Sequence, residues 1–346
     1  MRIAHVIFSF NTGGAETMLV DIVNEQINQA EISLIIINNK YNIELIHKID
    51  KRVKVFFIDR IESSRNPFPI IRLNALLLKL NIDVLHCHDH NISPLLFPSI
   101  KKKAVLTIHD VGIDTKHFAQ YKKLFAISKT VKDDIQVRSG ISSVLVYNGI
   151  CLNKILKKDY TIINNLFKIV IVSRLYHEKK GQHIAIEALK ILNRKGISNI
   201  QLDLIGTGNS EQYLKKLTTK YGLNEQVFFL GLRNRDYIYS HLKDYDLLLQ
   251  PSLYEGFGLT VVEGMAAKVP VLVSDIDGPK EIIENEKYGF QFSSGDINNL
   301  ADNIISLYHK YKLQDQLLLK VDMAYEHAKK KFDISITADN YLDNYF

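Results

Sequence analysis

The chain contains no tryptophan and only two cysteines among its 346 residues. Cys87 and Cys151 lie far apart in the sequence, so they do not form the dense cysteine framework of a small secreted domain. We interpret them as reduced thiols of a cytoplasmic protein. The sequence also lacks any apolar run near the roughly 18 residues that a membrane-spanning helix requires. We therefore expect no integral membrane protein.

What the chain does contain is typical of a globular protein. Hydrophobic residues make up 46% of the sequence, which is enough for well-packed cores and excludes a disordered chain. The length suits two domains of ordinary size. The net charge of +6 is uneven, since residues 1–160 hold 22 Lys and Arg against 15 Asp and Glu. This basic half predicts an anionic partner, with a simple solvated surface as the alternative.

Short apolar segments alternate with amphipathic ones along the whole chain. This alternation predicts βαβ units with buried parallel strands. A polar stretch near 151–166 separates two such series, which predicts two doubly wound Rossmann-like domains at 1–160 and 161–332. The predicted strands are 2–10, 32–38, 53–59, 82–88, 104–110, 123–128 and 142–149 in the first series, and 168–174, 200–206, 227–231, 246–252 and 269–275 in the second.

The segment QPSLYEGFGLTVVEG, residues 250–264, predicts a strand end, a glycine-flanked turn and a helix start. Gly256 and Gly258 let a ligand approach the backbone closely. The helix amides near Gly258, Leu259 and Thr260 would attract an anion, and the carboxylates of Glu255 and Glu263 suit sugar hydroxyls. The alternative is that Thr260 and Glu263 form a capping box that needs no ligand.

A second turn, SRLYHEKKG, places basic residues where another strand ends. Arg174 offers a planar fork of donors and Lys179 a point charge, a combination suited to a diphosphate. A third turn, GTGNS at 206–210, lacks the final glycine of a dinucleotide fingerprint, so we interpret it as a tight strand-to-helix turn near the ligand.

Taken together, these segments resemble one enzyme family. SRLYHEKKG followed by YEGFGLTVVE is similar to the retaining glycosyltransferases of family 4, which have the GT-B architecture. The segments NTGGAE, TIHD, AISK and VYNGI, and the closing FDISITADNYLDNY, resemble those of the family in the same order. The resemblance implies two Rossmann-like domains facing each other across a cleft. It also implies that the C-terminal helix, 333–346, packs back on the N-terminal domain.

The family's site residues carry over to this sequence position by position. Arg174 and Lys179 match the pair that holds the donor diphosphate, and Glu263 matches the carboxylate on the nucleotide ribose. Glu255 matches the carboxylate near the donor sugar hydroxyls, and His109 a histidine that faces the donor sugar. The loop under the phosphates and sugar corresponds to Gly256, Phe257, Gly258, Leu259 and Thr260, and the N-terminal loop that closes over the phosphate to Gly13 and Gly14.

The sequence departs from the family pattern at three places. Cys151 stands where aspartate is common, and Lys180 follows Lys179 where glycine is common, so Lys180 is the alternative diphosphate ligand. Gly264 replaces a common alanine within a helix, at an expected cost of ~1 kcal/mol.

The resemblance implies transfer of a sugar with retention of configuration, from a nucleotide-diphosphate donor to a glycan or lipid-linked acceptor. A UDP-sugar and a role in bacterial surface polysaccharide synthesis are the expected specifics. No metal or other cofactor is expected, because Arg174, Lys179 and helix amides supply positive charge. No nucleic acid partner is expected, since the basic residues do not alternate with aromatic ones in a recognisable pattern.

A basic amphipathic segment, FPIIRLNALLLKLNID, carries Arg72 and Lys79, and a lysine cluster follows at 101–103. This pattern predicts peripheral contact with anionic lipids, at the inner face of the cell membrane. The alternative is that Leu76, Leu77 and Leu80 merely cover the sheet.

Two other functions compete with sugar transfer. HCHDH places His86, His88 and His90 on one face of a strand, if the strand extends that far, as in a metal-dependent hydrolase. A GT-B protein that binds nucleotide sugars without transferring them is the second alternative.

Overall fold

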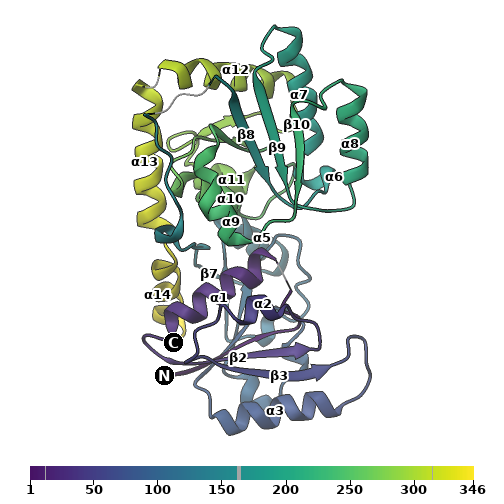
Figure 1. Cartoon of the computed structure of the whole chain (residues 1–346). Coiled ribbons are helices and arrows are strands. Elements are labelled where there is room, and N and C mark those ends of the chain that lie inside the picture. Colours follow the sequence, from purple (N-terminus) through teal and green to yellow (C-terminus); the bar gives the residue numbers. More distant parts are fainter. Residues whose placement is uncertain (12, 162–164, 314) are drawn as a thin grey trace. The chain divides into compact units, whose positions relative to one another are not determined.

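The structure is a computed structural model that describes residues 1–11, 13–161, 165–313 and 315–346. The chain forms two compact units, Met1–Ile150 with Phe332–Phe346, and Cys151–Lys331 (Figure 1). The first boundary therefore lies at residue 150 and not at 160. The reason is that the segment after Ile150 bonds within the second unit. The Leu156 amide donates to the Tyr239 carbonyl at 3.0 Å, and the Lys158 amide donates to the Ala267 carbonyl at 2.8 Å.

The first unit is built on a parallel sheet of seven strands in the order β3-β2-β1-β4-β5-β6-β7. Its strands are β1 Arg2–Ile7, β2 Glu31–Asn38, β3 Lys54–Arg60, β4 Val84–Cys87, β5 Ala104–Ile108, β6 Lys123–Ala126 and β7 Val144–Leu145. Its helices are α1 Gly14–Gln26, α2 Ile43–Ile46, α3 Phe68–Leu80, α4 Pro98–Lys101, α5 Lys129–Ser139 and α14 Ile334–Asn344, with short 3-10 turns at Ser93–Leu95 and Phe118–Gln120. The central strands are buried on both faces, as their continuous apolar runs predict.

The C-terminal helix α14 belongs to the first unit although it follows the second in sequence. Asp333 caps it by accepting a hydrogen bond from the Ser335 amide at 3.0 Å. The helix packs beside α1, and Tyr341 and Tyr345 are fully buried. The Thr337 hydroxyl donates to the Tyr147 carbonyl at 2.9 Å, which ties the helix to the end of the sheet.

The second unit is a parallel sheet of six strands in the order β10-β9-β8-β11-β12-β13. Its strands are β8 Phe167–Val172, β9 Ile200–Ile205, β10 Val227–Gly231, β11 Leu247–Gln250, β12 Val271–Ser274 and β13 Phe290–Phe292. Its helices are α6 His177–Lys180, α7 Gln182–Arg194, α8 Glu211–Lys220, α9 Arg235–His241, α10 Leu259–Ala266, α11 Asp277–Ile282, α12 Ile297–Leu313 and α13 Asp315–Lys331, with 3-10 turns at Leu152–Lys154 and Leu242–Asp244.

The core of the second unit follows from the two-residue period of its strands. Phe167, Ile169 and Ile171 of β8 point to one face, where they pack against apolar side chains of α7, α8 and α12. On this unit α7 packs beside both α8 and α12, and α10 packs against α11 and α13. Helices thus follow the strands in a doubly wound arrangement, as the alternating pattern predicts.

Within the described ranges, no helix combines the length and the apolar character that crossing a membrane requires.

Candidate functional site

The site in the second unit is built from three turns that leave the carboxyl ends of β8, β9 and β11. The turns after β8 and β9 touch through their backbones, because the Leu175 amide donates to the Thr207 carbonyl and the Ser210 amide donates to the Leu175 carbonyl, both at 3.0 Å. A Cβ atom on Gly206 would lie 2.1 Å from the Ser173 carbonyl oxygen, so only glycine permits this approach. The GTGNS segment is therefore a tight strand-to-helix turn.

The turn after β11 packs on the turn after β8 in the same manner. The Leu253 amide donates to the Lys179 carbonyl at 2.9 Å. Gly181 lies at φ +67°, and a Cβ atom there would lie 1.8 Å from the Pro251 carbonyl oxygen. The sheet thus brings the predicted cationic turn and the predicted carboxylate turn together at one edge, where parallel α/β sheets bind their ligands.

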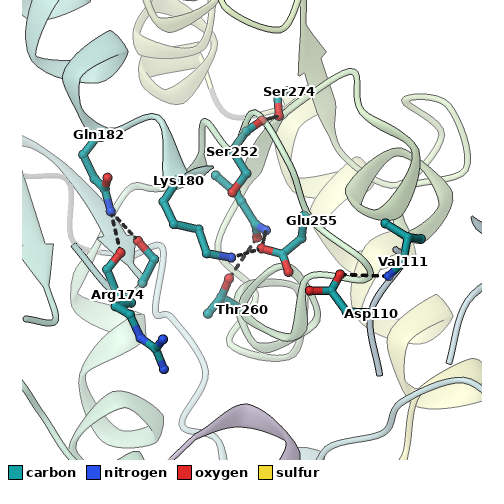
Figure 2. A network of polar contacts seen from close by, with 11 residues as sticks. Asp110, Val111, Arg174, Lys180, Gln182, Ser252, Glu255, Thr260 and Ser274 are labelled. Carbon is teal, nitrogen blue, oxygen red and sulfur yellow. Dashed lines mark hydrogen bonds and ion pairs between the residues drawn. The ribbon is translucent and has the colours of Figure 1, made fainter. Parts of the chain in front are cut away.

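Lys180 directs its ammonium group at the carboxylate of Glu255 (Figure 2). Both side chains of this ion pair are 19% exposed. The Gln250 amide donates to the same Glu255 oxygen at 3.2 Å. Lys179 instead places its ammonium 4.3 Å from the ring centroid of Tyr254. Both lysine side chains therefore contact the carboxylate turn, Lys180 through the Glu255 carboxylate and Lys179 through the Tyr254 ring.

Arg174 is exposed at the end of β8. Its backbone carbonyl accepts a hydrogen bond from the Gln182 side-chain amide at 2.9 Å, and the same amide donates to the Ser173 hydroxyl at 2.9 Å. Figure 2 shows the guanidinium group pointing away from Gln182. The first turn of α7 therefore holds the backbone at Arg174 and leaves the cationic fork available.

Helix α10 starts directly after the glycine-flanked turn, and Gly258 at φ 112° is its N-cap. Thr260 lies inside the helix, and its hydroxyl donates to the Gln250 side-chain oxygen at 2.9 Å. The capping-box interpretation of Thr260 and Glu263 is therefore wrong. Glu263 lies one turn into the helix and is half-buried. Phe257 is buried within the turn. The first backbone amides of α10, directly after Gly258, are of the kind that can bind an anion.

Gly264 has a packing role that the sequence comparison with alanine did not reveal. A Cβ atom on Gly264 would lie 2.8 Å from a Val271 methyl carbon and 3.1 Å from a Leu248 methyl carbon. The glycine lets α10 lie directly on β11 and β12. The predicted cost of ~1 kcal/mol for glycine is therefore offset here by close helix–sheet packing.

In the first unit, His109 follows β5 and lies at the end of a buried row of imidazoles. Its Nε2 atom is 3.3 Å from Nδ1 of His88, and Nε2 of His88 is 3.0 Å from Nδ1 of His5. Burial lowers the pKa of His5 and of His109 to about 4, and holds that of His88 well below its usual value. These imidazoles are neutral at neutral pH.

The metal-binding alternative rested on His86, His88 and His90. Strand β4 ends at Cys87, so His90 does not continue its face, and this expectation is wrong. Ring nitrogens of His5, His86 and His88 do lie within 4.8 Å of one another. Each of these rings already engages both of its nitrogens within the protein; those of His86 lie 2.8 Å from the Tyr345 hydroxyl and 2.7 Å from the Thr107 hydroxyl. A metal ion would have to break these hydrogen bonds.

Gly13 and Gly14 form the start of α1, with Gly13 as the extended N-cap. Thr12, in the same NTGGAE segment, lies outside the described residues. The structure places these glycines in the first unit and Arg174, Glu255 and Glu263 in the second.

Sequence reasoning missed several residues that complete the site. Gln250 holds both Glu255 and Thr260, and Gln182 holds the backbone at Arg174. The available signal was position, since Gln250 lies within the predicted strand 246–252 and Gln182 directly follows the cationic turn. His5 gave no signal, because one histidine within an apolar strand has no recognisable partner in the sequence.

Two family models match successive parts of the chain. The model of Glycosyltransferase Family 4 matches residues 12–154, and that of Glycosyl transferases group 1 matches residues 153–318. Together they cover both units, apart from the termini.

Individual glycosyltransferases also match the chain, at low sequence identity. The chain is 28% identical over 241 residues to the uncharacterized glycosyltransferase MJ1607 of Methanocaldococcus jannaschii, a match that covers 60% of this chain and 61% of that protein. It is 24% identical over 318 residues to the UDP-Gal:alpha-D-GlcNAc-diphosphoundecaprenol alpha-1,3-galactosyltransferase of Escherichia coli, with 78% and 80% covered.

Among solved structures, Alr3699/HepE of Anabaena in complex with UDP superposes with a TM-score of 0.81 at 22% identity, covering 99% of each chain. A glycosyltransferase from Rickettsia africae also gives a TM-score of 0.81, at 21% identity, with 99% of this chain and 97% of that chain covered. These likenesses confirm the predicted fold class, which is GT-B with two Rossmann-like units.

Proposed function

The chain belongs to the group 1 glycosyltransferases of family 4, and we propose that it transfers a sugar from a UDP-sugar to a hydroxyl group with retention of configuration. The acceptor in this proposal is a glycan or a lipid-linked sugar of bacterial surface polysaccharide synthesis. The E. coli relative is named for a UDP-galactose donor and an undecaprenol-linked acceptor, which supports this choice of substrate classes.

One observation carries the proposal. The ion pair between Lys180 and Glu255, the exposed Arg174 and the N-terminus of α10 lie on turns that pack on one another at one edge of the second sheet. This arrangement offers fixed positive charge for a diphosphate and carboxylates for hydroxyl groups within one small region. In the proposal Arg174 and Lys180 hold the diphosphate, and Lys179 is the alternative to Lys180.

The other roles follow the family resemblance. Glu263 holds the ribose hydroxyls and Glu255 the donor sugar hydroxyls, each by accepting hydrogen bonds. The backbone of 256–260 supports the phosphates and sugar. From the first unit, His109 contacts the donor sugar, and Gly13 with Gly14 closes over the phosphate.

The proposed reaction breaks the bond between the anomeric carbon and the diphosphate oxygen, and that electron pair leaves with the diphosphate. The acceptor oxygen bonds to the anomeric carbon on the face from which the diphosphate leaves, and the acceptor's proton moves to the leaving phosphate oxygen. Arg174, Lys180 and the α10 amides stabilise the charge that develops on the diphosphate. No metal or other cofactor is part of this proposal, because these groups supply the positive charge.

The proposal includes peripheral contact with anionic lipid at the inner face of the membrane. On α3, Phe68, Ile71 and Leu78 are 73%, 51% and 53% exposed, and the exposed Arg72 and Lys79 lie among them. An exposed apolar stripe with basic residues suits a membrane surface. Leu77 is buried, so that leucine does cover the sheet.

Calorimetric titration of UDP, GDP, ADP and dTDP into the purified chain tests the donor. We expect micromolar binding of UDP alone, lost in Glu263→Ala. A transfer assay with UDP-sugars and a lipid-linked acceptor then separates the enzyme from the alternative. Tight UDP binding without transfer to any acceptor would favour a binding protein, and binding of none of the four nucleotides would refute the proposal.

A further inference from the structure

The first unit contains a continuous row of buried hydrogen-bonding side chains that ends at His109. It begins at Gln26, the last residue of α1, whose side-chain oxygen lies 2.8 Å from Nε2 of His5. It continues from Nδ1 of His5 to Nε2 of His88 at 3.0 Å, and from Nδ1 of His88 to Nε2 of His109 at 3.3 Å. Gln26, His5 and His88 are each less than a tenth exposed.

This row has a direction, because an amide oxygen can only accept a hydrogen bond and a neutral imidazole has one donor and one acceptor. Gln26 therefore requires the proton of His5 on Nε2, which leaves Nδ1 of His5 as an acceptor. His88 must then donate from its own Nε2, which leaves its Nδ1 to accept from Nε2–H of His109. The remaining nitrogen, Nδ1 of His109, carries no proton. Nδ1 of His109 is buried and has no hydrogen-bond partner among the described residues.

A second arm of the same network is consistent with this orientation of the Gln26 amide. The Gln26 side-chain nitrogen donates to the Tyr345 hydroxyl at 3.2 Å, and that hydroxyl lies 2.8 Å from Nδ1 of His86. Nε2 of His86 lies 2.7 Å from the Thr107 hydroxyl, which donates to Tyr341 at 3.2 Å. With Tyr345 donating to His86, every member of this arm is satisfied. Reversing the amide would invert every hydrogen bond of both arms together and would place the proton of His109 on Nδ1, as a buried N–H without a hydrogen-bond partner among the described residues.

The row keeps this order of donors and acceptors only while its rings are neutral, because a protonated imidazole has two donors and no acceptor. Burial lowers the pKa of His5 and His109 to about 4 and keeps those of His86 and His88 well below the ordinary value. The nearby Asp110 opposes this for His109 but does not overcome the effect of burial.

We propose that Gln26, His5 and His88 are positioning residues that lock His109 in the Nε2–H tautomer, so that His109 offers only a hydrogen-bond acceptor at Nδ1. This inference rests on the proposed function and adds a substrate specificity to it. The group of the donor sugar that contacts His109 must itself donate a hydrogen bond. A hydroxyl or an N–H would be accepted, whereas a deoxy or O-methylated position would leave Nδ1 buried and unpaired.

The tautomer can be read directly in the protein without substrate. We would record long-range 1H–15N spectra of the full chain with 15N-labelled histidine at neutral pH, and assign His109 through His109→Gln. The expected result is a protonated Nε2 and an unprotonated Nδ1. A protonated Nδ1 in the wild-type chain would overturn the inference, whatever any variant shows.

Gln26→Met tests whether Gln26 sets the tautomer of His109, because methionine has a similar length but lacks the amide oxygen that accepts the hydrogen bond from His5. We expect His109 to become a mixture of tautomers in this variant. Tyr341→Phe is the matched control, since it removes a buried hydroxyl from the far end of the second arm and should leave the His109 signals unchanged. Wild-type signals in folded Gln26→Met would overturn the role of Gln26.

Steady-state kinetics tests whether the tautomer of His109 affects sugar transfer. Gln26→Met should lower kcat for the UDP-sugar while UDP affinity, which depends on the second unit, stays unchanged. Loss of kcat and UDP affinity together would contradict a positioning role. If no transfer is found with any donor while His109 shows the expected tautomer, the proposed function fails and the tautomer inference stands.

Discussion

Lys179 and Lys180 are adjacent in the chain, yet their charges lie in different surroundings. Lys180 pairs with Glu255, and Lys179 lies over the ring of Tyr254. We expect Lys180→Ala to lower kcat/KM by about 10²–10³-fold, because it removes a preorganised charge beside the leaving group. Lys179→Ala is the control and should cost less than about tenfold. Steady-state kinetics of the two variants decides, and the reverse ranking would assign the diphosphate to Lys179.

At Gly264 helix propensity and packing predict opposite effects of alanine. Propensity alone favours alanine by ~1 kcal/mol, but the added Cβ would lie 2.8 Å from Val271. We expect Gly264→Ala to destabilise the chain by about 1–3 kcal/mol in denaturant unfolding. Combining it with Val271→Ala should cost less than the sum of the two single variants, since the second change removes the clashing methyl. A more stable Gly264→Ala would refute this packing role.

Helix α3 allows the membrane proposal to be tested at the scale of one element. We expect the chain to cosediment with anionic phospholipid vesicles and not with neutral ones. Arg72→Glu with Lys79→Glu should weaken binding by at least about 30-fold, because each basic residue contributes ~1 kcal/mol near an anionic surface. Lys329→Glu with Lys330→Glu, on the exposed side of α13, makes the same charge change as a control. Equal loss of vesicle binding in both double variants would indicate that only the net charge of the chain matters.

The histidines on and after strands β1, β4 and β5 make stability depend on pH. Burial lowers the pKa of His5 and His109 to about 4 in the folded chain, against about 6.5 when unfolded. The unfolded state therefore binds more protons below pH 6.5, and stability is lost as the pH falls from 6.5 towards 4. Each such histidine should lower the free energy of unfolding by about 1.4 kcal/mol per pH unit in that range. Unfolding curves that do not change between pH 7 and 5 would contradict this.

At the scale of the whole molecule, the chain returns to its first unit through its last residues. Phe332, Tyr341 and Tyr345 are fully buried there, and Tyr345 contacts Gln26 and His86. We expect deletion of residues 332–346 to destabilise the first unit by more than about 5 kcal/mol, since large aromatic side chains contribute about 3–5 kcal/mol each.

Hydrogen exchange measures this deletion in each unit separately. Protection should fall in β1 and β4 and remain in β8 and β9, whose core is formed within 151–331. Tyr345→Phe is the conservative control, because it keeps the ring and removes only the hydroxyl, and it should lose far less protection. Equal loss of protection in both units would contradict the division of the chain into these two units.

Much of the architecture followed from local sequence. Apolar runs alternate with amphipathic segments, and a strand buried on both faces needs nothing but its own composition to be identified. The site turns were located for a similar reason, because glycines and charged residues follow such strands at 174–181 and 255–263. Parallel strands place their carboxyl ends at one edge, so these turns were expected to meet.

The rest depended on contacts that have no local signature. Lys180, at the end of the short helix α6, contacts Glu255 only because the turns after β8 and β11 pack together. Gly264 is required because α10 lies so close to the sheet that a larger residue would clash with Val271. His5 meets His86 only through the register of β1 and β4, and Gln26 and Tyr345 reach them from the two ends of the chain. Periodicity and motifs act over a few residues and predict strands and turns, whereas these pairings are set by packing between distant segments, which only the folded chain brings together.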